Sequence, residues 1–365
     1  MDKPKVLFAV GSLHGGGAER VVSVWANQMA ERGYNVAILV FARSKDEYTL
    51  SDKVSVYSCA DSLEDYLALS YFKRFVFYRQ VLKTYSPNYI IPFLRTTRMW
   101  MFFSSIGLSI KRIETIRINP WVEEKSINFV SRIINRLIFR LAYKIIIQAR
   151  EQRDWLAKND RMKAVLIPNP LQEKYMQLDN VSRKEVVTNF ISVGRLHPQK
   201  NYPMLIQGFA KVAQRFPHLK LYIWGSGPTR YVEELENQIQ ACLMSDNIFL
   251  MGRSYEIENE YLRSDVFVMT SDYEGSPNAL IEAMASGLVC VSTDCKTGPK
   301  ELIDSEINGF LIPVGSEAGL SEVLQNILTM SVDDRLKIGR QAREKVLNVH
   351  SVANSVCALC NLFND

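Results

Sequence analysis

The feature that most constrains the fold is an alternation of short apolar runs with amphipathic stretches, which occurs twice along the chain. The runs are rich in β-branched residues, as buried parallel strands are. They lie at 5–10, 35–41, 54–59, 89–94, 114–118, 144–148 and 164–167, and again at 190–194, 219–224, 248–251, 265–270, 290–293 and 310–313. Helical patterns separate the runs, so the sequence predicts an α/β protein with two doubly wound, Rossmann-like domains.

A chain of 365 residues has the right length for two such domains. We expect an N-terminal domain at 1–170, a polar linker at 171–188 and a second domain at 189–348. The last segment, 349–365, is predicted to be a helix that packs back towards the first domain. The two domains are expected to face each other across a cleft, which is the usual ligand site in such architectures.

Cysteines and histidines are scattered, which argues against a disulfide framework and against a metal site. Six cysteines lack framework spacing, and the Cys357–Cys360 pair lies in an apolar helical pattern, so core packing in a reducing compartment is expected. The four histidines are far apart, so neither a metal nor a cofactor is predicted. The first apolar run is too short for a signal peptide and 99–110 is too short to cross a bilayer, so the protein is predicted to be cytoplasmic.

Positive charge is concentrated in one part of the first domain. Residues 67–150 contain fifteen Lys and Arg against three acids, a net charge of +12, while the whole chain carries only +5. Such a segment predicts an anionic partner. No nucleic-acid-binding motif accompanies the charge, so nucleic acid is not expected, and association with an anionic membrane surface is the preferred interpretation.

The segment 131–144 sharpens that interpretation. Its apolar residues fall on one helical face and its basic residues recur at every fourth position beside it. The apolar set is Ile133, Ile134, Leu137, Ile138 and Leu141, and the basic set is Arg132, Arg136, Arg140 and Lys144. Such a helix either lies on an anionic membrane or packs its apolar face on the core and leaves its basic face in solvent.

Two strand–turn–helix segments predict ligand contacts. In the first, Gly15, Gly16 and Gly17 separate a strand from a helix, which lets the backbone approach a ligand, although such a cluster can be a plain turn and is not a full dinucleotide fingerprint. In the second, 271–287, a turn leads into a helix that begins near Pro277, and carboxylates stand at Glu274 and Glu282. Taken alone, these two acids are more often solvated bystanders.

The turns of the second domain argue for a common site. Arg195 with Lys200, Gly225 with Gly227, and Glu274 with Glu282 all follow predicted strands. In a doubly wound sheet these turns gather at one edge. Two cations, two glycines and a helix N-terminus at one edge are suited to a diphosphate, because Arg and Lys can hold it and stabilise the charge of a leaving group.

With these motifs, the chain resembles the nucleotide-sugar-dependent glycosyltransferases of family 4, which are retaining enzymes of the GT-B fold. The matching segments are 16–20 (GGAER), 193–201 (VGRLHPQKN), 225–228 (GSGP), 274–287 (EGSPNALIEAMASG), 298–302 (GPKEL) and 308–313 (NGFLIP). The resemblance covers nearly the whole chain and is looser between residues 46 and 150.

The resemblance implies a role for each site residue. Arg195 and Lys200 would hold the diphosphate, Glu274 would face the donor sugar, and these three form the expected catalytic set. Glu282 would bind the ribose, and Arg253 would lie beside the base. The full donor-binding set is Gly15, Gly16, Gly17, Gly225, Gly227, Arg253, Ser276, Asn278, Ala279, Leu280 and Glu282. Family members often carry a histidine in the loop where this chain has Arg117 and Asn119, so no catalytic histidine is assigned.

The expected reaction is metal-independent transfer of a sugar, with retention, from a nucleoside diphosphate donor, preferably a UDP-sugar, to an acceptor hydroxyl. The acceptor is expected to be a glycan, preferably linked to a polyprenyl diphosphate at the inner face of a bacterial membrane. Two alternatives stay open. A UDP-sugar 2-epimerase has the same architecture, but would leave the basic first domain without a purpose. A non-catalytic subunit of a glycosyltransferase complex would be expected to lack the charged donor residues.

Overall fold

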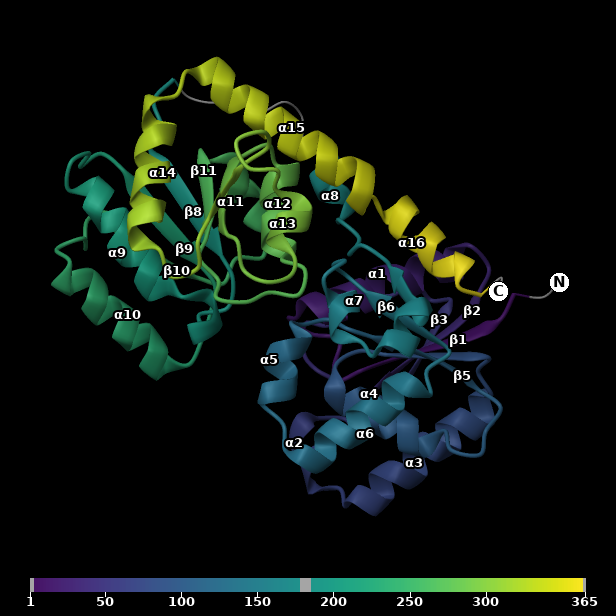
Figure 1. Ribbon diagram of the computed structural model, residues 1–365. Helices are drawn as coiled ribbons and strands as arrows, with labels where there is room; N and C mark the ends of the chain where they lie inside the picture. The colour runs from purple at the N-terminus through teal and green to yellow at the C-terminus, as the bar shows by residue number, and fades with distance from the viewer. Residues whose placement is uncertain (1–2, 178–184, 364–365) are drawn as a thin grey trace. The chain divides into compact units, whose positions relative to one another are not determined.

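The protein is described by a computed structural model over residues 3–177 and 185–363 (Figure 1). The chain divides into two compact units. Unit 1 comprises Met1–Pro170 and Val352–Asp365, and unit 2 comprises Leu171–Ser351. Of the predicted linker at 171–188, residues 178–184 lie outside the described residues, and the part before them contains a short helix, α8 (Glu173–Met176).

Unit 1 is built on a seven-stranded sheet in the order β3-β2-β1-β4-β5-β6-β7, with every neighbouring pair parallel. Its strands are β1 (Lys5–Val10), β2 (Asn35–Val40), β3 (Val54–Ser58), β4 (Tyr89–Pro92), β5 (Lys111–Thr115), β6 (Lys144–Ile147) and β7 (Ala164–Leu166). Its helices are α1 (Gly17–Glu31), α2 (Leu63–Ala68), α3 (Tyr71–Tyr85), α4 (Arg95–Ser104), α5 (Pro120–Lys125), α6 (Phe129–Arg140), α7 (Gln152–Trp155), the 3-10 helix η1 (Lys158–Lys163) and α16 (Val352–Asn361).

Unit 2 contains a six-stranded sheet in the order β10-β9-β8-β11-β12-β13, again parallel throughout. Its strands are β8 (Asn189–Val193), β9 (Lys220–Trp224), β10 (Ile248–Gly252), β11 (Val266–Met269), β12 (Val289–Thr293) and β13 (Phe310–Ile312). Its remaining helices are η2 (Pro198–Lys200), α9 (Tyr202–Ala213), α10 (Thr229–Ala241), α11 (Ile257–Leu262), α12 (Asn278–Ala285), α13 (Pro299–Leu302), α14 (Glu317–Thr329) and α15 (Val332–His350).

Both units are three-layered because successive strand residues point to opposite faces of a sheet. In unit 1, Phe8 packs with α1 and α16, while its neighbours Leu7 and Ala9 pack with α3 and α4. In unit 2, α9, α10 and α14 cover one face, and α12 and α15 cover the other. The strands are apolar on both sides, as the sequence predicts, and the fold class is confirmed.

The C-terminal helix α16 belongs to unit 1. The buried indole of Trp25 on α1 donates from Nε1 to Ser355 Oγ over 2.9 Å, and Ser355 Oγ donates to the carbonyl O of Pro168 over 2.7 Å. Trp25 is fully buried, and burying a side chain of that size contributes about 4 to 6 kcal/mol. These hydrogen bonds therefore hold α1 and α16 to each other and to the chain at Pro168.

One strand boundary differs from expectation. The fifth strand was predicted at 114–118, but β5 covers Lys111–Thr115, because Lys111 and Arg112 pair with Tyr89 and Ile90 of β4. Charged residues conceal the start of this strand. The residues after Thr115 form a loop at the carboxyl end of the sheet.

In each sheet there is one point at which the order of strands reverses. Successive strands run outward from β1 to β3 on one side and from β4 to β7 on the other, and likewise from β8 to β10 and from β11 to β13. The loops after β1 and β4, and after β8 and β11, thus lead away from each other at this point of each sheet, where a doubly wound fold has its crevice. Ligands of doubly wound proteins bind at this point.

Candidate active site

The crevice of unit 2 lies between the loops that follow β8 and β11. The first loop carries Arg195 and Lys200, and the second carries Ser271 and Glu274. The loops come from neighbouring strands that pair in parallel. Residues more than seventy positions apart are therefore brought to the same edge, as the sequence predicts.

Lys200 and Glu274 are in direct contact. Lys200 Nζ donates to Glu274 Oε1 over 2.6 Å, and the same oxygen accepts a hydrogen bond from Ser271 Oγ over 2.7 Å. The two side chains are only 15% and 9% exposed. An ion pair shielded from water to this extent is fixed in geometry and interacts more strongly than a surface pair. The cation expected on the diphosphate and the carboxylate expected on the sugar thus form one polar unit.

Gly194 lets the Lys200 side chain reach that position. A Cβ at residue 194 would lie 3.0 Å from Lys200 Cε and 3.2 Å from the hydroxyl of Tyr202. The Tyr202 hydroxyl in turn donates to the carbonyl O of Gly194 over 3.0 Å. Neither Gly194 nor Tyr202 was predicted as a site residue, although both lie next to predicted ones.

Arg195 contrasts with Lys200. Its side chain is exposed, and its guanidinium makes no ion pair with any residue in the described part of the chain. Arg195 follows β8 on the same loop as Lys200, and an exposed guanidinium can receive an anion from solvent.

Glu282 lies on α12 and is 5% exposed. The hydroxyl of Tyr261 on α11 is 3.4 Å from Glu282 Oε2 and 3.2 Å from the carbonyl O of Ala279. A buried carboxylate one turn into a helix can accept from two neighbouring hydroxyls of a ligand. Tyr261, which was not predicted, orients it.

The three residues at the start of α12 that are predicted to contact the donor through their backbone differ in their surroundings. The Leu280 side chain is fully buried in the core, and its N–H donates to the carbonyl O of Pro277 over 3.1 Å. Asn278 and Ala279 are the first two residues of α12 and lie in its first turn. Pro277 itself takes the N-cap position rather than the first helical position.

The glycines after β9 hold the site loops together. A Cβ at Gly225 would lie 1.8 Å from the carbonyl O of Gly194, and a Cβ at Gly227 would lie 2.1 Å from that of Leu196. Leu196 N donates to the carbonyl O of Ser226 over 2.8 Å. Both glycines therefore permit close packing against the loop that carries Arg195 and Lys200, whatever contact they make with a ligand.

Thr297 and Gly298 support the Glu274 loop from β12. Thr297 is 2% exposed and has a φ of 74°, a left-handed conformation that is strained for a β-branched residue. Its Oγ1 donates to the carbonyl O of Glu274. A Cβ at Gly298 would lie 2.8 Å from Pro277 Cδ. The sequence alone does not reveal that this hydroxyl holds the Glu274 loop.

Ser276 and Arg253 are the last two predicted donor residues of unit 2. Ser276 is half-buried in the turn before α12. Arg253 follows β10, the edge strand, and its guanidinium lies 5.1 Å from the ring centroid of Tyr255. Arg253 is exposed, so the edge of this sheet offers both a cation and an aromatic ring.

The predicted glycine turn lies in unit 1, at the carboxyl end of β1. Gly15 has a φ of 72° with open space around its Cβ position, and Gly16 is the N-cap of α1, which begins at Gly17. The other side of this crevice begins at Leu94, directly after β4. Leu94 has a φ of 68° and a ψ of 162°, a region that non-glycine residues rarely adopt. The strain is therefore located where a ligand of unit 1 would bind.

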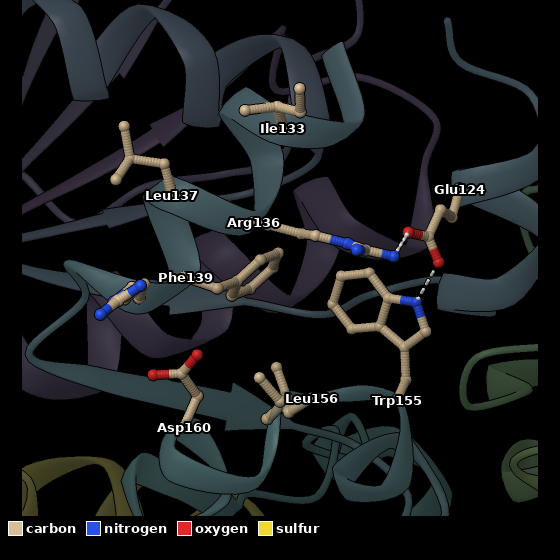
Figure 2. A pocket seen from close by; sticks show the side chains of 10 residues that line it. Glu124, Ile133, Arg136, Leu137, Phe139, Trp155, Leu156 and Asp160 are labelled. Carbon is tan, nitrogen blue, oxygen red and sulfur yellow. Dashed lines mark hydrogen bonds and ion pairs between the residues drawn. The ribbon is translucent and has the colours of Figure 1, made fainter. Parts of the chain in front are cut away.

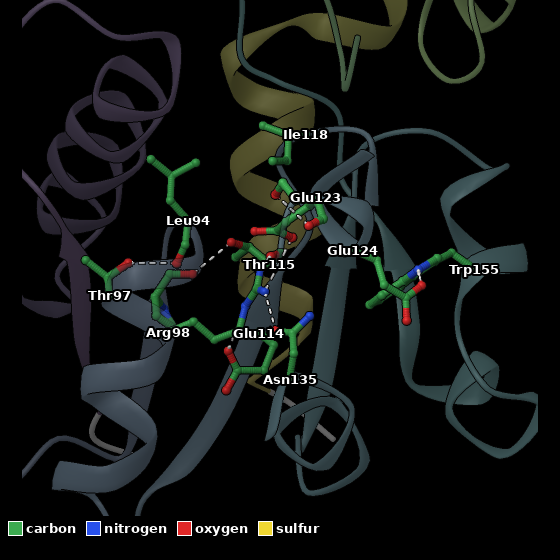
Figure 3. Close-up of polar contacts among 12 residues, drawn as sticks. Leu94, Thr97, Arg98, Glu114, Thr115, Ile118, Glu123, Glu124, Asn135 and Trp155 are labelled. Atoms are coloured by element: carbon green, nitrogen blue, oxygen red, sulfur yellow. Dashed lines mark hydrogen bonds and ion pairs between the residues drawn. The ribbon is translucent and has the colours of Figure 1, made fainter. Parts of the chain in front are cut away.

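Behind that loop lies a buried charge cluster centred on Arg98 (Figure 3). Arg98 is 1% exposed and donates to the carbonyl O of Thr115 over 2.7 Å and to Asn135 Oδ1 over 2.9 Å. It also lies 3.8 Å from Glu114 Oε2 and 3.7 Å from Glu123 Oε2. These bonds connect α4, β5, α5 and α6 at the carboxyl side of the sheet.

Glu114 should make stability depend on pH. Burial raises its pKa from 4.5 to about 7, and the attraction of Arg98 and Arg112 only partly opposes this shift. The folded state thus keeps a proton that the unfolded chain releases, so this contribution to stability is present below pH 4.5 and is lost as the pH rises through 7.

The matching experiment compares wild type with Glu114→Gln in urea unfolding between pH 5 and 8. The variant should gain about 1 to 3 kcal/mol relative to wild type as the pH rises, because its amide does not titrate. A difference in unfolding free energy that stays constant over this range would reject the shifted pKa.

The two residues that stand where a histidine is common have structural contacts. Arg117 is 8% exposed, with its guanidinium 4.7 Å from the Trp25 ring centroid and 4.1 Å from that of Phe93. Burial lowers its pKa to about 9. Asn119 caps α5, accepting from the N–H groups of Trp121 and Val122.

The described part of the chain contains neither a cluster of metal-binding side chains nor a membrane-spanning helix. Over 3–177 and 185–363, no three His, Cys, Asp or Glu side chains are grouped as a metal ion would need. Over the same ranges, no helix has both the length and the apolar character required to cross a bilayer.

Unit 2 is similar to a known protein family. Residues 179–345 match the family model described as glycosyl transferases group 1. The match covers the sheet of unit 2 and every residue of the Arg195, Lys200, Glu274 and Glu282 set.

Curated relatives extend the likeness to unit 1. An uncharacterized glycosyltransferase of Haemophilus influenzae is 28% identical over 345 residues, covering 91% of this chain and 94% of the relative. The GalNAc-alpha-(1->4)-GalNAc-alpha-(1->3)-diNAcBac-PP-undecaprenol alpha-1,4-N-acetyl-D-galactosaminyltransferase of Campylobacter jejuni is 27% identical over 330 residues, covering 89% of each chain. An uncharacterized glycosyltransferase of Methanocaldococcus jannaschii is 32% identical over 238 residues, or 60% of this chain, and only 56% of that relative is spanned.

Solved structures share the whole architecture. HepE of Anabaena, crystallised with UDP and glucose, superposes with a TM-score of 0.79 at 16% identity and covers 99% of both chains. Staphylococcus aureus TarM, as a G117R mutant with UDP, superposes with the same TM-score at 14% identity. The solved structures show that this chain has the two-domain GT-B architecture, and residues 179–345 of it are similar to the group 1 glycosyl transferases.

Proposed function

We propose that the protein transfers a sugar from a nucleoside diphosphate donor, a UDP-sugar, to a hydroxyl of a glycan acceptor with retention of the anomeric configuration. The observation that carries the proposal is the Lys200–Glu274 pair at the carboxyl edge of the unit 2 sheet, with the exposed cation Arg195 on the same loop as Lys200. UDP occurs in the structures of HepE and TarM, which supports the choice of base.

Each side chain has a distinct task in this proposal. Arg195 and Lys200 hold the diphosphate and stabilise its negative charge as the bond to the sugar breaks. The departing diphosphate takes the proton of the acceptor hydroxyl. Glu282 accepts hydrogen bonds from the ribose hydroxyls, and Glu274 accepts from hydroxyls of the sugar. The two cations take the place of a divalent metal, so chelators should leave turnover unchanged.

The acceptor is assigned to unit 1, where Leu94 and Gly15 flank the other crevice. We favour a glycan linked to a polyprenyl diphosphate, as in the name of the Campylobacter relative. The basic segment 67–150, with a net charge of +12, would then meet an anionic membrane at its cytoplasmic face.

The two alternatives are less well supported. An epimerase needs no acceptor, and the strain at Leu94 together with the basic segment would serve nothing in its reaction. A non-catalytic subunit has no need of a shielded Lys–Glu pair.

A thermal-shift experiment tests the donor site directly. UDP at roughly 100-fold above its Kd should raise the unfolding free energy by about 2.7 kcal/mol, which is a shift of about 5 °C or more for a unit of this size. Glu282→Gln should reduce the shift, because an amide accepts the ribose hydrogen bonds less well. Glu236→Gln, an exposed acid on α10, is the matched control.

The same preparation tests the reaction. Donors that shift the melting temperature are then incubated with a lipid-linked acceptor pool, and UDP release is followed. NMR of the product should show the donor's anomeric configuration. UDP release with an inverted product would reject retention, and interconversion of sugars without an acceptor would favour the epimerase.

A further inference from the structure

Helix α6 exposes the apolar residues that its sequence gathers on one face. Phe129 is 74% exposed, Val130 63%, Ile133 52%, Leu137 43% and Leu141, the C-cap residue, 55%. Their spacing of three to four residues aligns them along one side of the helix. The core-facing alternative is thus wrong for most of this face, because only Ile138 of the predicted apolar set is fully buried.

The same side of α6 carries arginines and no acid. Arg136 and Arg140 are both exposed, and the helix sequence contains three arginines without an Asp or Glu. Arg136 Nη2 pairs with Glu124 Oε1 over 2.8 Å. The Arg140 guanidinium makes no ion pair or hydrogen bond with the described residues. It is therefore available to an external anion.

A pocket of about 560 Å³ opens between α6 and the segment from Trp155 to Asp160 (Figure 2). Most of the residues that line the pocket are apolar, and the exposed Arg136 and Arg140 of α6 line it as well. The residues are Glu124, Ile133, Arg136, Leu137, Phe139, Arg140, Trp155, Leu156, Ala157 and Asp160. Figure 2 shows Phe139, Leu156 and Trp155 around the hollow, with Arg136 reaching across to Glu124. The size is within the range of small-molecule sites.

The exposed apolar residues and arginines of α6 restrict what kind of partner can cover this side of the helix. An exposed row of large apolar side chains marks an interaction surface. A second copy meeting the same surface would bring Arg136 and Arg140 against their own equivalents, which like-charge repulsion disfavours. Nucleic acid offers phosphates but no partner for five exposed aliphatic and aromatic side chains. An anionic bilayer provides both hydrocarbon and negative charge.

We propose that α6 lies in the surface of an anionic bilayer and that the pocket beneath it binds a phospholipid, with an acyl chain along Leu137 and Leu156 and the phosphate at Arg140. Binding to a bilayer is useful to this protein only if its acceptor is lipid-linked, as proposed above. The ligand of the pocket, however, is the phospholipid of the bilayer and not the acceptor. The test of this proposal requires no sugar transfer.

The first experiment is flotation with phosphatidylcholine vesicles, with and without phosphatidylglycerol and without polyprenyl lipid. The protein should float only with phosphatidylglycerol, and less at high salt. Leu137→Glu and Arg140→Glu should each weaken binding about tenfold or more. The matched controls are Leu243→Glu and Arg230→Glu in unit 2, at side chains as exposed or more so, and these should bind normally.

The second experiment places a lipid in the pocket. Phosphatidylglycerol brominated on its acyl chain should quench the fluorescence of Trp155, which is measured as the part of the quenching that is lost in Trp155→Phe. Equal quenching of wild type and Trp155→Phe would overturn the pocket site. Vesicle binding that appears only after a polyprenyl diphosphate lipid is added would overturn the proposal, because the ligand would then be the acceptor.

The UDP thermal shift separates this proposal from the donor assignment. A normal UDP shift without vesicle binding rejects the phospholipid site alone. Vesicle binding without any nucleotide shift rejects the donor assignment and leaves the phospholipid site in place. Circular dichroism of each variant confirms that it is folded before either result is interpreted.

Discussion

Lys200→Ala is expected to lower turnover by about a hundred- to a thousand-fold, the usual effect of removing one group that stabilises a developing negative charge. The loss should be mainly in kcat, because the charge on the diphosphate grows as the sugar departs. UDP release with the best donor and acceptor, measured at a temperature where the variant is folded, gives the result.

The ion pair adds a second consequence to this substitution. Without Lys200, the carboxylate of Glu274 keeps only the Ser271 hydrogen bond at Oε1, at 7% exposure. An unpaired buried charge is unfavourable, so a lower melting temperature is expected as well. Lys211→Ala is the matched control, since Lys211 pairs with Glu317 over 3.0 Å at 54% exposure. Near-normal turnover of folded Lys200→Ala would reject the diphosphate assignment.

The second large effect is expected from Gly225→Ala. The new Cβ would lie 1.8 Å from the carbonyl O of Gly194, a backbone atom that cannot rotate away. The loops after β8 and β9 must separate, at a loss of about 3 kcal/mol of unfolding free energy, or about 6 to 12 °C in Tm. The UDP shift should disappear too, because the displaced loop carries Arg195 and Lys200.

Gly315→Ala provides the comparison for Gly225→Ala. Gly315 also has a positive φ, 75°, but nothing lies within 4 Å of its Cβ position. It therefore reports the conformational strain alone, about 1 kcal/mol. Equal destabilisation of the two variants would show that the close contact between the loops has no energetic weight.

The sequence was sufficient to predict the strands and the meeting of Lys200 and Glu274 at one edge of the unit 2 sheet. Buried parallel strands are apolar on both faces, so each strand shows as a continuous run such as that of β11. Lys200 and Glu274 follow strands that are neighbours in a doubly wound sheet, and their approach could be predicted from that alone. The fifth strand was predicted three residues too late in the chain, because β5 begins with the charged residues Lys111 and Arg112, which do not belong to an apolar run.

Contacts that depend on the third dimension could not be predicted. The role of Thr297 requires a left-handed backbone and a hydroxyl aimed at the Glu274 loop, and neither has a sequence signature. The close approach of the Lys200 side chain to Gly194 depends on the conformation of that side chain, which the sequence does not reveal. For α6, periodicity reveals that an apolar face exists, but the direction of that face depends on which helix side contacts the sheet. Ile138 turns inward while Ile133 and Leu137 turn outward.

The Lys200–Glu274 pair also has a consequence for product release. A bound diphosphate must draw Lys200 away from a carboxylate 2.6 Å distant. In the proposed mechanism, the sugar hydroxyls of the intact donor replace the lysine as partners of Glu274. With the spent nucleotide no such replacement exists, so re-forming the pair favours dissociation. We therefore expect the enzyme to bind its donor more tightly than the nucleoside diphosphate it leaves behind, which would limit product inhibition.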